Sequence, residues 1–255
     1  MSTLIDELSK LDEQSPEPMG FGTASKSSRR PSVLIIGTTK LKALARKPKM
    51  VEAKVDAVLI EIDGVEERLW DKALSHIGNI PWGIRSHGIS NDSLDKLIKQ
   101  GCDFLIFEAK SSDASILNRD DLGKVIVVEP GIDRDKTAAI NSLALDAVLY
   151  ENIVLKEMMT IGDIFDLSRV KAQLGIPILV STSRVIIPSE IEPLREVGTA
   201  AILTSLAANK RIEQLKDQID SLPSRKKDRR LGDALLPKPE YGFSPPSEDD
   251  FDEDE

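Results

Sequence analysis

The chain has 255 residues, of which 40% are hydrophobic and only 4% aromatic, so it can bury a sizeable core in one large domain or two ordinary ones. Seven of the last eight residues are acidic and account for most of the net charge of −9, which leaves the rest close to neutral. A single cysteine, Cys102, excludes an internal disulfide. With no apolar run of membrane-spanning length and no signal peptide, we predict a cytoplasmic protein that does not enter a membrane.

Residues 1–31 are expected to form a short helix followed by a linker. Ser2 or Thr3 can cap the helix, and residues 15–32 are rich in Pro, Gly and Ser. Four apolar residues fall on one helical face: Leu4, Ile5, Leu8 and Leu11. A helix this short is marginal in water, so it should dock under the folded body or on a partner. Because it supplies no strand, we expect its proteolytic removal to change the melting temperature little.

Between residues 32 and 222, apolar strand-like runs alternate with helical segments. The fourth connection, residues 110–123, has room for only a turn or two of helix, and Asn91 or Asp92 is expected to cap the helix that precedes it. Eight strands are predicted, at residues 32–37, 56–62, 81–87, 103–109, 124–129, 146–151, 177–182 and 200–205. Helices are predicted at residues 65–78, 91–101, 161–175, 188–198 and 210–222. Eight such units predict an α/β fold, a single (β/α)8 TIM barrel with flexible terminal extensions.

Three even-numbered strands end on glutamate in one register: DAVLIE, DFLIFE and DAVLYE. Side chains of a strand alternate between its faces, and barrel interiors are filled by layers drawn from alternate strands. Two layers are predicted to comprise Ala57, Phe104, Ala147 and Ala200, then Leu59, Ile106, Leu149 and Ile202. The next ring, at the C-terminal mouth where barrel sites are built, comprises Glu61, Glu108, Glu151 and Thr204.

This carboxylate ring has two interpretations. It can be a solvated rim whose acids pair with neighbours such as Lys110, or a site in which Glu61, Glu108 and Glu151 are candidate catalytic residues. Three converging carboxylates repel one another unless a cation intervenes. If the ring is functional, replacing Glu108 with Gln should relieve repulsion and raise stability while abolishing ligand binding.

Arg85 and His87 share one phase of the third strand, between the strands of Glu61 and Glu108. If that phase faces inward, Arg85 neutralises the ring and binds ligand, and His87 is a candidate acid, base or metal ligand. If it faces outward, Arg85 forms salt bridges among the helices. Glu129 is a further ligand-binding candidate near the mouth.

The last quarter resembles the aldolase-type phosphate-binding barrels, which include indole glycerol phosphate synthase and thiamine phosphate synthase. The matching parts are Ile-Pro-Ile at residues 176–178, the helix PSEIEPLREVG and the apolar strand before Thr204 and Ser205. The resemblance implies the fold and an anion site after strands seven and eight. The phosphate-binding glycines are missing, however, since Ser181-Thr182-Ser183-Arg184 and Thr204-Ser205 stand in their places. Hydroxyls of Thr182, Thr204 and Ser205, with Arg184, are the remaining anion-binding candidates.

Two functions follow from these patterns. The first is a site for a small anionic molecule or a divalent metal ion at the mouth, with a glutamate as general acid or base or with the acids holding the metal. The second is a non-catalytic barrel that acts as an interaction or scaffold protein, binding a protein partner through its N-terminal helix, its surface or its acidic tail. The segment 223–255, basic at SRKKDRR and then acidic, is predicted to be a disordered tail. Nucleic acid is not expected as a partner, because no binding module surrounds that basic run.

Overall fold

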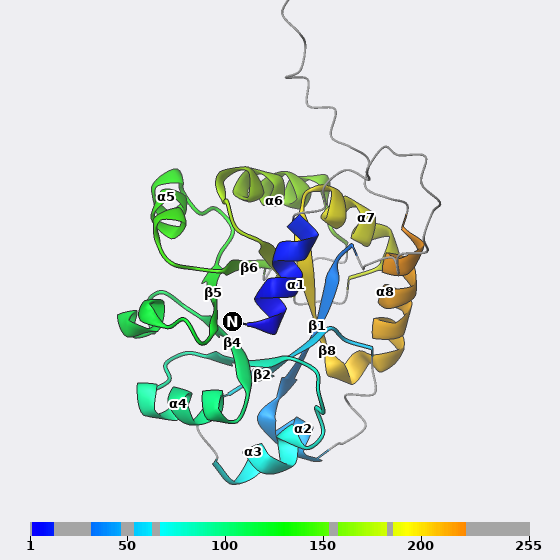
Figure 1. Ribbon diagram of the computed structural model, residues 1–255. Coiled ribbons are helices and arrows are strands. Elements are labelled where there is room, and N and C mark those ends of the chain that lie inside the picture. Colours follow the sequence, from blue (N-terminus) through cyan, green and yellow to red (C-terminus); the bar gives the residue numbers. More distant parts are fainter. Residues whose placement is uncertain are drawn as a thin grey trace, which may run out of the picture. The chain divides into compact units, whose positions relative to one another are not determined.

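Eight parallel strands close into a barrel in the computed structural model, which describes residues 2–12, 32–46, 54–62, 67–152, 158–182 and 186–222 (Figure 1). Each strand pairs with the next along the chain, and the last pairs with the first. The predicted linker and C-terminal tail, with its basic and acidic runs, lie outside the described residues. No helix within those residues is long and apolar enough to cross a membrane.

The strands are β1 (Leu34–Lys40), β2 (Ala57–Glu61), β3 (Trp82–Ser86), β4 (Cys102–Phe107), β5 (Gly123–Val128), β6 (Ala147–Asn152), β7 (Ile178–Thr182) and β8 (Thr199–Ser205). The helices are α1 (Thr3–Asp12), α2 (Leu41–Arg46), α3 (Glu67–Leu74), α4 (Asn91–Lys99), α5 (Arg134–Ser142), α6 (Ile161–Gln173), α7 (Pro188–Glu196) and α8 (Asn209–Ser221), with 3₁₀ turns η2 (Ala114–Asn118) and η3 (Leu206–Ala208). All eight predicted strands and the (β/α)8 architecture are confirmed.

Local details of the helices differ from the expectations. The pattern did not indicate α2 or α5, of which α2 is a short six-residue helix. The cap of α4 is Ser90, whose hydroxyl accepts from the backbone N–H of Ser93, so Asn91 and Asp92 lie in the first turn instead. A serine one residue upstream satisfies the same free N–H group as an Asn or Asp cap would.

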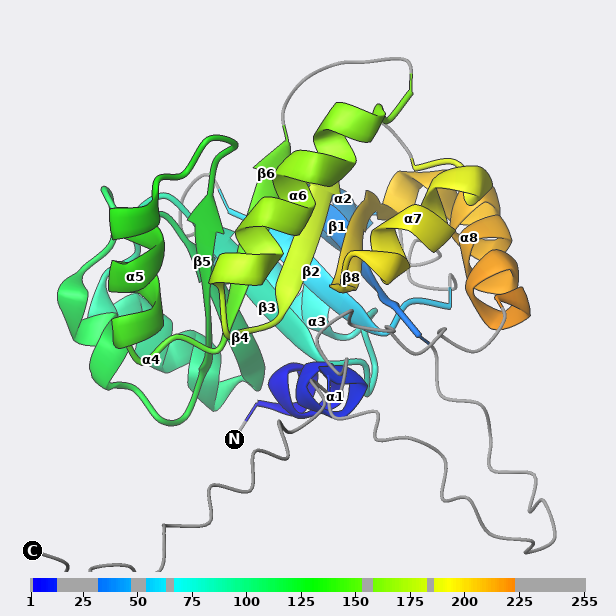
Figure 2. The same ribbon diagram turned by 90° about the horizontal axis from the view of Figure 1, so that it is seen from above.

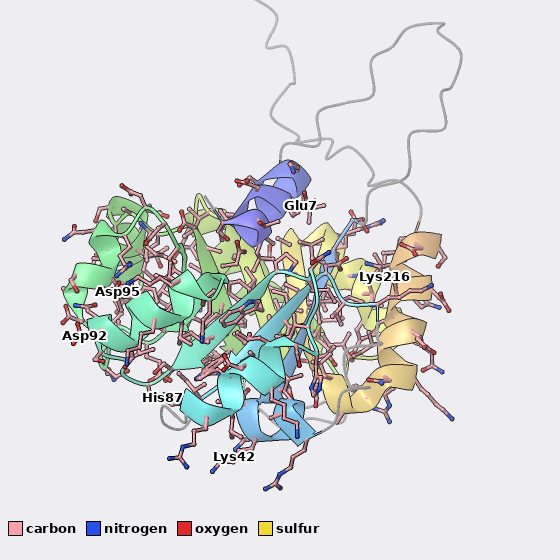
Figure 3. All side chains as sticks on the ribbon, turned by 60° about the horizontal axis from the view of Figure 1, so that its bottom comes forward. Glu7, Lys42, His87, Asp92, Asp95 and Lys216 are labelled. Carbon is pink, nitrogen blue, oxygen red and sulfur yellow. The ribbon has the colours of Figure 1, made fainter. Side chains whose placement is uncertain are left out.

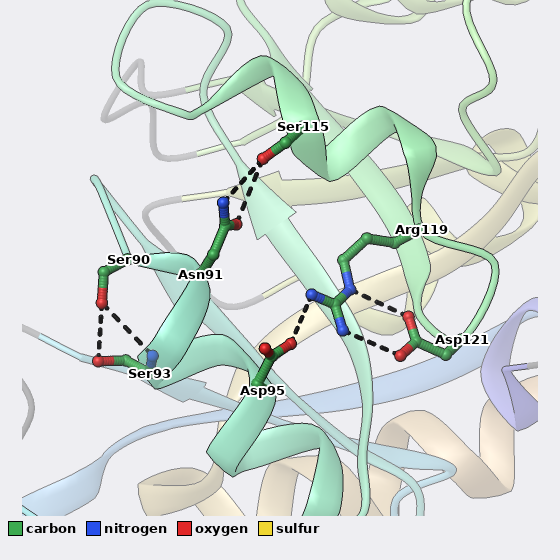
Figure 4. Close-up of polar contacts among 7 residues, drawn as sticks. All are labelled: Ser90, Asn91, Ser93, Asp95, Ser115, Arg119 and Asp121. Carbon is green, nitrogen blue, oxygen red and sulfur yellow. Dashed lines mark hydrogen bonds and ion pairs between the residues drawn. The ribbon is translucent and has the colours of Figure 1, made fainter.

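The β4–β5 connection holds only the 3₁₀ turn η2, as its length predicted, and polar contacts fix it to α4 (Figure 4). Arg119 contacts Asp95 of α4 at 2.7 Å and donates two hydrogen bonds to Asp121, each of 3.0 Å. Asn91 of α4 and Ser115 of η2 also exchange two hydrogen bonds, of 2.9 and 3.3 Å. These contacts hold η2 in the position that a full helix fills in the other units.

The barrel separates two apolar cores, one between strands and helices and one inside the strands. The inner core comprises Leu34, Ile36, Ala57, Leu59, Phe104, Ile106, Val125, Ala147, Leu149, Leu179, Ala200, Ala201 and Leu203, with Leu4 and Leu8 of α1. The inward phase predicted for β2, β4 and β6 is therefore confirmed. Along these strands, alternate residues lead upward to Glu61, Glu108 and Glu151.

The predicted phase of β8 holds for Ala200, which lies in the inner core, but is wrong for Ile202 and Thr204. Pairing with β7 shifts by one residue, since Ile178 pairs with Thr199 and Leu179 pairs with Ala201. An extra residue in one strand reverses the faces of everything after it. Ile202 therefore packs in the outer core, and Leu203 faces the interior. Thr204 is likewise turned out of the ring.

The aspartates that open the three motifs bind backbone N–H groups at the opposite end of the barrel. Asp56 accepts from Ile35 N at 2.8 Å, and Asp146 accepts from Lys124 N at 2.7 Å. Each carboxylate thereby ties its own strand to the preceding odd-numbered strand. Asp103 serves α1 instead, accepting from Ser2 Oγ, Thr3 N and Leu4 N at 2.7–2.9 Å.

Helix α1 lies across the N-terminal end of the strands (Figure 2). Its first turn is held by Asp103, and Leu4 and Leu8 are almost fully buried in the inner core. Gly123 lets it approach, because a Cβ there would lie 2.8 Å from both Ser2 Oγ and Ile5 Cγ1. Of the two expected docking places, the helix occupies the one under the barrel, so we now expect its removal to destabilise the core.

We predict that Gly83→Ala lowers the free energy of unfolding by about 2 kcal/mol, as overpacking of a core does. Gly83 faces the interior beside Phe104, and a Cβ would press on the Phe104 carbonyl oxygen and lie 2.5 Å from its ring atom Cδ2. Urea denaturation measures the loss. Gly131→Ala is unsuitable as a control because its φ of 83° penalises any side chain, whereas Gly175, with nothing within 4 Å, is suitable. Equal stability of the Gly83→Ala and Gly175→Ala variants would contradict the prediction.

Candidate functional site

Arg85 lies at the centre of the ionisable groups at the C-terminal mouth. Register places it beside Glu61, since these two residues are partners in the β2–β3 pairing and so share the inward face. Its guanidinium donates two parallel hydrogen bonds to Glu151, of 2.7 and 2.8 Å. A second carboxylate, that of Glu108, lies 3.6 Å from Arg85 Nη2. The inward alternative for β3 is therefore correct, and β3 reaches across the barrel to β6.

His87 and Glu108 form a second pair next to this one. Nδ1 of His87 lies 3.1 Å from Oε1 of Glu108, within hydrogen-bond distance. His87 is mostly exposed, and Figure 3 shows it at the end of the barrel opposite Glu7 of α1. Glu108 thus contacts both Arg85 and His87, so one carboxylate connects the enclosed ion pair to an accessible imidazole.

The electrostatic setting keeps Arg85 charged. The hydrogen bond to Glu151 raises the pKa of Arg85, and the charges of Glu151, Glu61 and Glu108 raise it further, against a lowering by burial. All three glutamates of the predicted ring therefore act on the same guanidinium. The cation that three converging carboxylates require is part of the protein itself.

Other predicted site residues are placed less centrally. Glu129 follows β5 and is exposed. Ser205, at the end of β8, is also exposed, and its hydroxyl accepts from Ala207 N. Thr204 is buried outside the ring, and its hydroxyl has no partner within the described part of the chain. The side chain of Thr182 and all of Arg184 lie outside the described residues.

Three polar residues at the mouth were not singled out from the sequence. Thr38 pairs with Ser205 in the register, Lys40 with Glu61, and Ser181 with Glu151, so each shares the inward face of its partner. A signal for two of them existed, because Thr38 and Lys40 directly follow the predicted first strand in the same alternating phase. That strand ends at Lys40 rather than at Gly37.

The described segments contain side chains of the metal-ligating types and the single thiol, Cys102. Among those residues, no group of three or more His, Cys, Asp and Glu side chains is arranged to hold a metal ion. Burial raises the pKa of Cys102 to about 12, so its thiol stays protonated at neutral pH and is a poor nucleophile. The chemistry that the site offers is hydrogen bonding to carboxylates and proton transfer by His87 or Glu108.

No protein-family model matches the sequence, and no curated protein matches it. Solved structures do match. The tryptophan synthase alpha chain of Legionella pneumophila has a TM-score of 0.56 at 14% identity, over 88% of this chain and 99% of that one. The 3-keto-L-gulonate-6-phosphate decarboxylase of Vibrio cholerae has a TM-score of 0.56 at 16% identity, over 74% and 97%.

The thiamine phosphate pyrophosphorylase of Pyrococcus furiosus has a TM-score of 0.53 at 11% identity, over 74% of this chain and 95% of that one. Identities this low carry the fold and not the activity. The three solved structures agree with the closed eight-stranded barrel and with the resemblance of residues 176–205 to barrel proteins. The chain therefore has the fold of a (β/α)8 TIM barrel.

Proposed function

We propose that the mouth of this barrel binds a small polar molecule that is neutral or positively charged, and that His87, supported by Glu108, moves a proton to or from it. The observation that carries the proposal is the convergence of Glu61, Glu108 and Glu151 on Arg85. Barrel enzymes build their sites at this end of the strands. Ionisable groups that act strongly on one another at such a place are candidates for a functional site.

The pairing pattern indicates the charge of the ligand. Arg85 and Glu151 satisfy each other through two hydrogen bonds, which leaves Glu61 and the Glu108–His87 pair to meet a ligand. Carboxylates only accept hydrogen bonds. The ligand should therefore donate them, as the hydroxyl groups of a polyol or the ammonium group of an amine do.

A phosphate ester fits this mouth less well than the fold comparison suggests. Its oxygens need N–H donors, usually from a glycine-rich turn at a helix N-terminus. Thr204 stands where such a turn has a glycine, and the three acids of the ring outnumber the two cations Arg85 and Lys40. We therefore place sugar phosphates among the compounds that should not bind.

His87 is suited to proton transfer by its contact with Glu108. When Nδ1 donates to that carboxylate, Nε2 is the nitrogen left to accept and return a proton. Glu108 then has the supporting role of fixing the tautomer and stabilising the imidazolium. Arg85 and Glu151 position Glu108 without needing to touch the ligand.

We expect neutral polyols or small amines to raise the melting temperature in a saturable manner, because a ligand that binds only the folded state stabilises it by mass action. Sugar phosphates, Mg²⁺ and Mn²⁺ form the contrasting panel. Glu108→Gln and His87→Gln should abolish the shift, while Glu213→Gln, an exposed glutamate of α8, should retain it. Because Arg85 already compensates Glu108, Glu108→Gln should itself raise stability by less than about 1 kcal/mol.

Two results would count against the proposal. A shift with sugar phosphates and none with polyols or amines would reject the proposed ligand class. No shift with any compound, together with an unchanged melting temperature of Glu108→Gln, would indicate a solvated rim.

The non-catalytic alternative also has an observation in its favour. Several large apolar side chains are exposed around the start of α6, which follows the C-terminal end of β6. An interaction through α1, in contrast, would require Leu4 and Leu8 to leave the inner core.

A further inference from the structure

The inward side chains at the mouth form two unlike halves. Over β3, β4 and β6 they are ionic and are joined to one another through Arg85 and Glu108. Over β7, β8 and β1 they include three hydroxyl groups, those of Ser181, Ser205 and Thr38. We call these three residues the hydroxyl side. The mouth thus has a charged half and a half that offers neutral hydrogen-bonding groups.

Strand register fixes the inward direction of the hydroxyl side. Thr38 pairs with Leu59 and Ser181 pairs with Leu203, and both leucines lie in the inner core. Ser205 is the register partner of Thr38. Each of the three residues also follows an inner-core residue of its own strand by two positions. The hydroxyl side therefore lines the interior directly above the apolar core.

The hydroxyl side has hydrogen-bonding capacity left for a ligand. Thr38 and Ser181 are half-buried, and neither hydroxyl group is hydrogen-bonded to another of the described residues. The hydroxyl group of Ser205 accepts from Ala207 N and keeps its proton to donate. Because a hydroxyl group both donates and accepts, these residues match a ligand that does the same.

These groups favour a polyol over an amine. A polyol can donate to the carboxylate of Glu61 and can both donate to and accept from Thr38 and Ser181, whereas an ammonium group only donates. The negative charge that would attract an amine is partly compensated within the protein. Arg85 acts on all three ring carboxylates, and Lys40 is the register partner of Glu61. A neutral ligand therefore suits this half of the mouth better than a cation.

We propose that the hydroxyl side makes the mouth selective for a neutral polyhydroxylated compound, a sugar or a polyol, with Thr38 and Ser181 as the residues that set this specificity. The inference rests on the proposed function and narrows its ligand class. In the closed barrel, β7 and β3 lie four strands apart and so face each other. A polyol held by the hydroxyl side therefore presents its other end to His87, which follows β3.

NMR titrations of the ¹⁵N-labelled full chain with sorbitol, ribose, glucose, myo-inositol and butylamine test the selectivity. At least one of the polyols and sugars should bind about tenfold more tightly than butylamine, the gain expected from two further neutral hydrogen bonds. Thr38→Val and Ser181→Ala each remove one hydroxyl group. Each variant should weaken that binding about fivefold.

Two control variants identify the hydroxyl group as the cause. Thr38→Ser keeps the hydroxyl group and should keep the affinity within about twofold. Thr39→Val alters the neighbouring residue, which pairs with Ile60 of the outer core and so faces the helices. This variant should leave the affinity unchanged. Melting temperatures close to that of the wild type show that the variants are folded.

The results distinguish this selectivity from the function on which it rests. Binding of butylamine that is lost in Glu108→Gln, without binding of any polyol or sugar, would overturn the selectivity and leave the proposed function in place. Polyol binding that is unchanged in both Thr38→Val and Ser181→Ala would overturn the role of the hydroxyl side. Binding of neither class would overturn both proposals.

Discussion

Replacing Arg85 with methionine is expected to lower the free energy of unfolding by about 3 kcal/mol, the magnitude seen when one partner of a buried ion pair is removed. The side chains of Arg85 and Glu151 are only 16% and 19% exposed, so Glu151 would lose both hydrogen bonds without gaining full hydration. Glu61 and Glu108 would lose the positive charge of Arg85, which interacts with all three acids. Urea denaturation measures the loss.

A control variant and a double variant show whether the loss in Arg85→Met comes from the ion pair. Arg119→Met removes an arginine of similar exposure whose partners Asp95 and Asp121 are about half exposed, so it should cost less than about 1 kcal/mol. The double variant Arg85→Met/Glu151→Met should recover most of the stability, because a buried apolar pair can replace an ion pair. A loss below about 0.5 kcal/mol for Arg85→Met alone would contradict the arrangement.

Leu8→Ala is expected to cost about 3 kcal/mol, within the range for truncating a fully buried leucine. Leu8 is completely buried in the inner core, although it comes from outside the strands. Ser9→Ala, on the exposed side of α1, should change stability by less than about 0.5 kcal/mol. Both are measured by urea denaturation.

Deleting residues 1–14 extends this test. The deletion would expose the lower layer of the inner core and leave Asp103 without its three donors from Ser2, Thr3 and Leu4. The melting temperature should fall markedly. Unchanged melting after deletion, with Leu8→Ala also neutral, would show that α1 does not close the barrel in solution.

The regular part of the fold was predictable because it follows from sequence patterns that recur along the chain. Alternation of strands and helices indicated the barrel, and the inward phase of β2, β4 and β6 followed from two-residue periodicity. The irregular parts were not. The shift at Thr199–Ala201 that reverses β8 leaves no mark in an apolar run whose residues suit either face.

The candidate site was predictable to a similar degree. The shared register of Glu61, Glu108 and Glu151 followed from the repeated motifs. The inward direction of Arg85 did not, since PWGIRSH permits either phase, and only its pairing with Glu61 settles it. The bidentate contact with Glu151 joins residues 66 positions apart, which no local pattern encodes.

The aspartates that open the same three motifs form a recurring pattern whose structural role was not predicted. Asp56, Asp103 and Asp146 recur as regularly as the glutamates, yet their role is to bind backbone N–H groups at the other end of the barrel. The motif thus has a structural end and a candidate functional end. That Asp103 binds α1 rather than a strand required knowledge of where the N-terminus docks.

The most direct test of the mouth as a ligand site is an amide chemical-shift titration of the ¹⁵N-labelled protein with the polyol or amine that stabilises it most. We expect saturable shifts concentrated at the ends of β2, β3, β4 and β6, around Glu61, Arg85 to His87, Glu108 and Glu151, and we expect Glu108→Gln to abolish them. Shifts that are absent from these strand ends, or that persist unchanged in Glu108→Gln, would contradict this prediction.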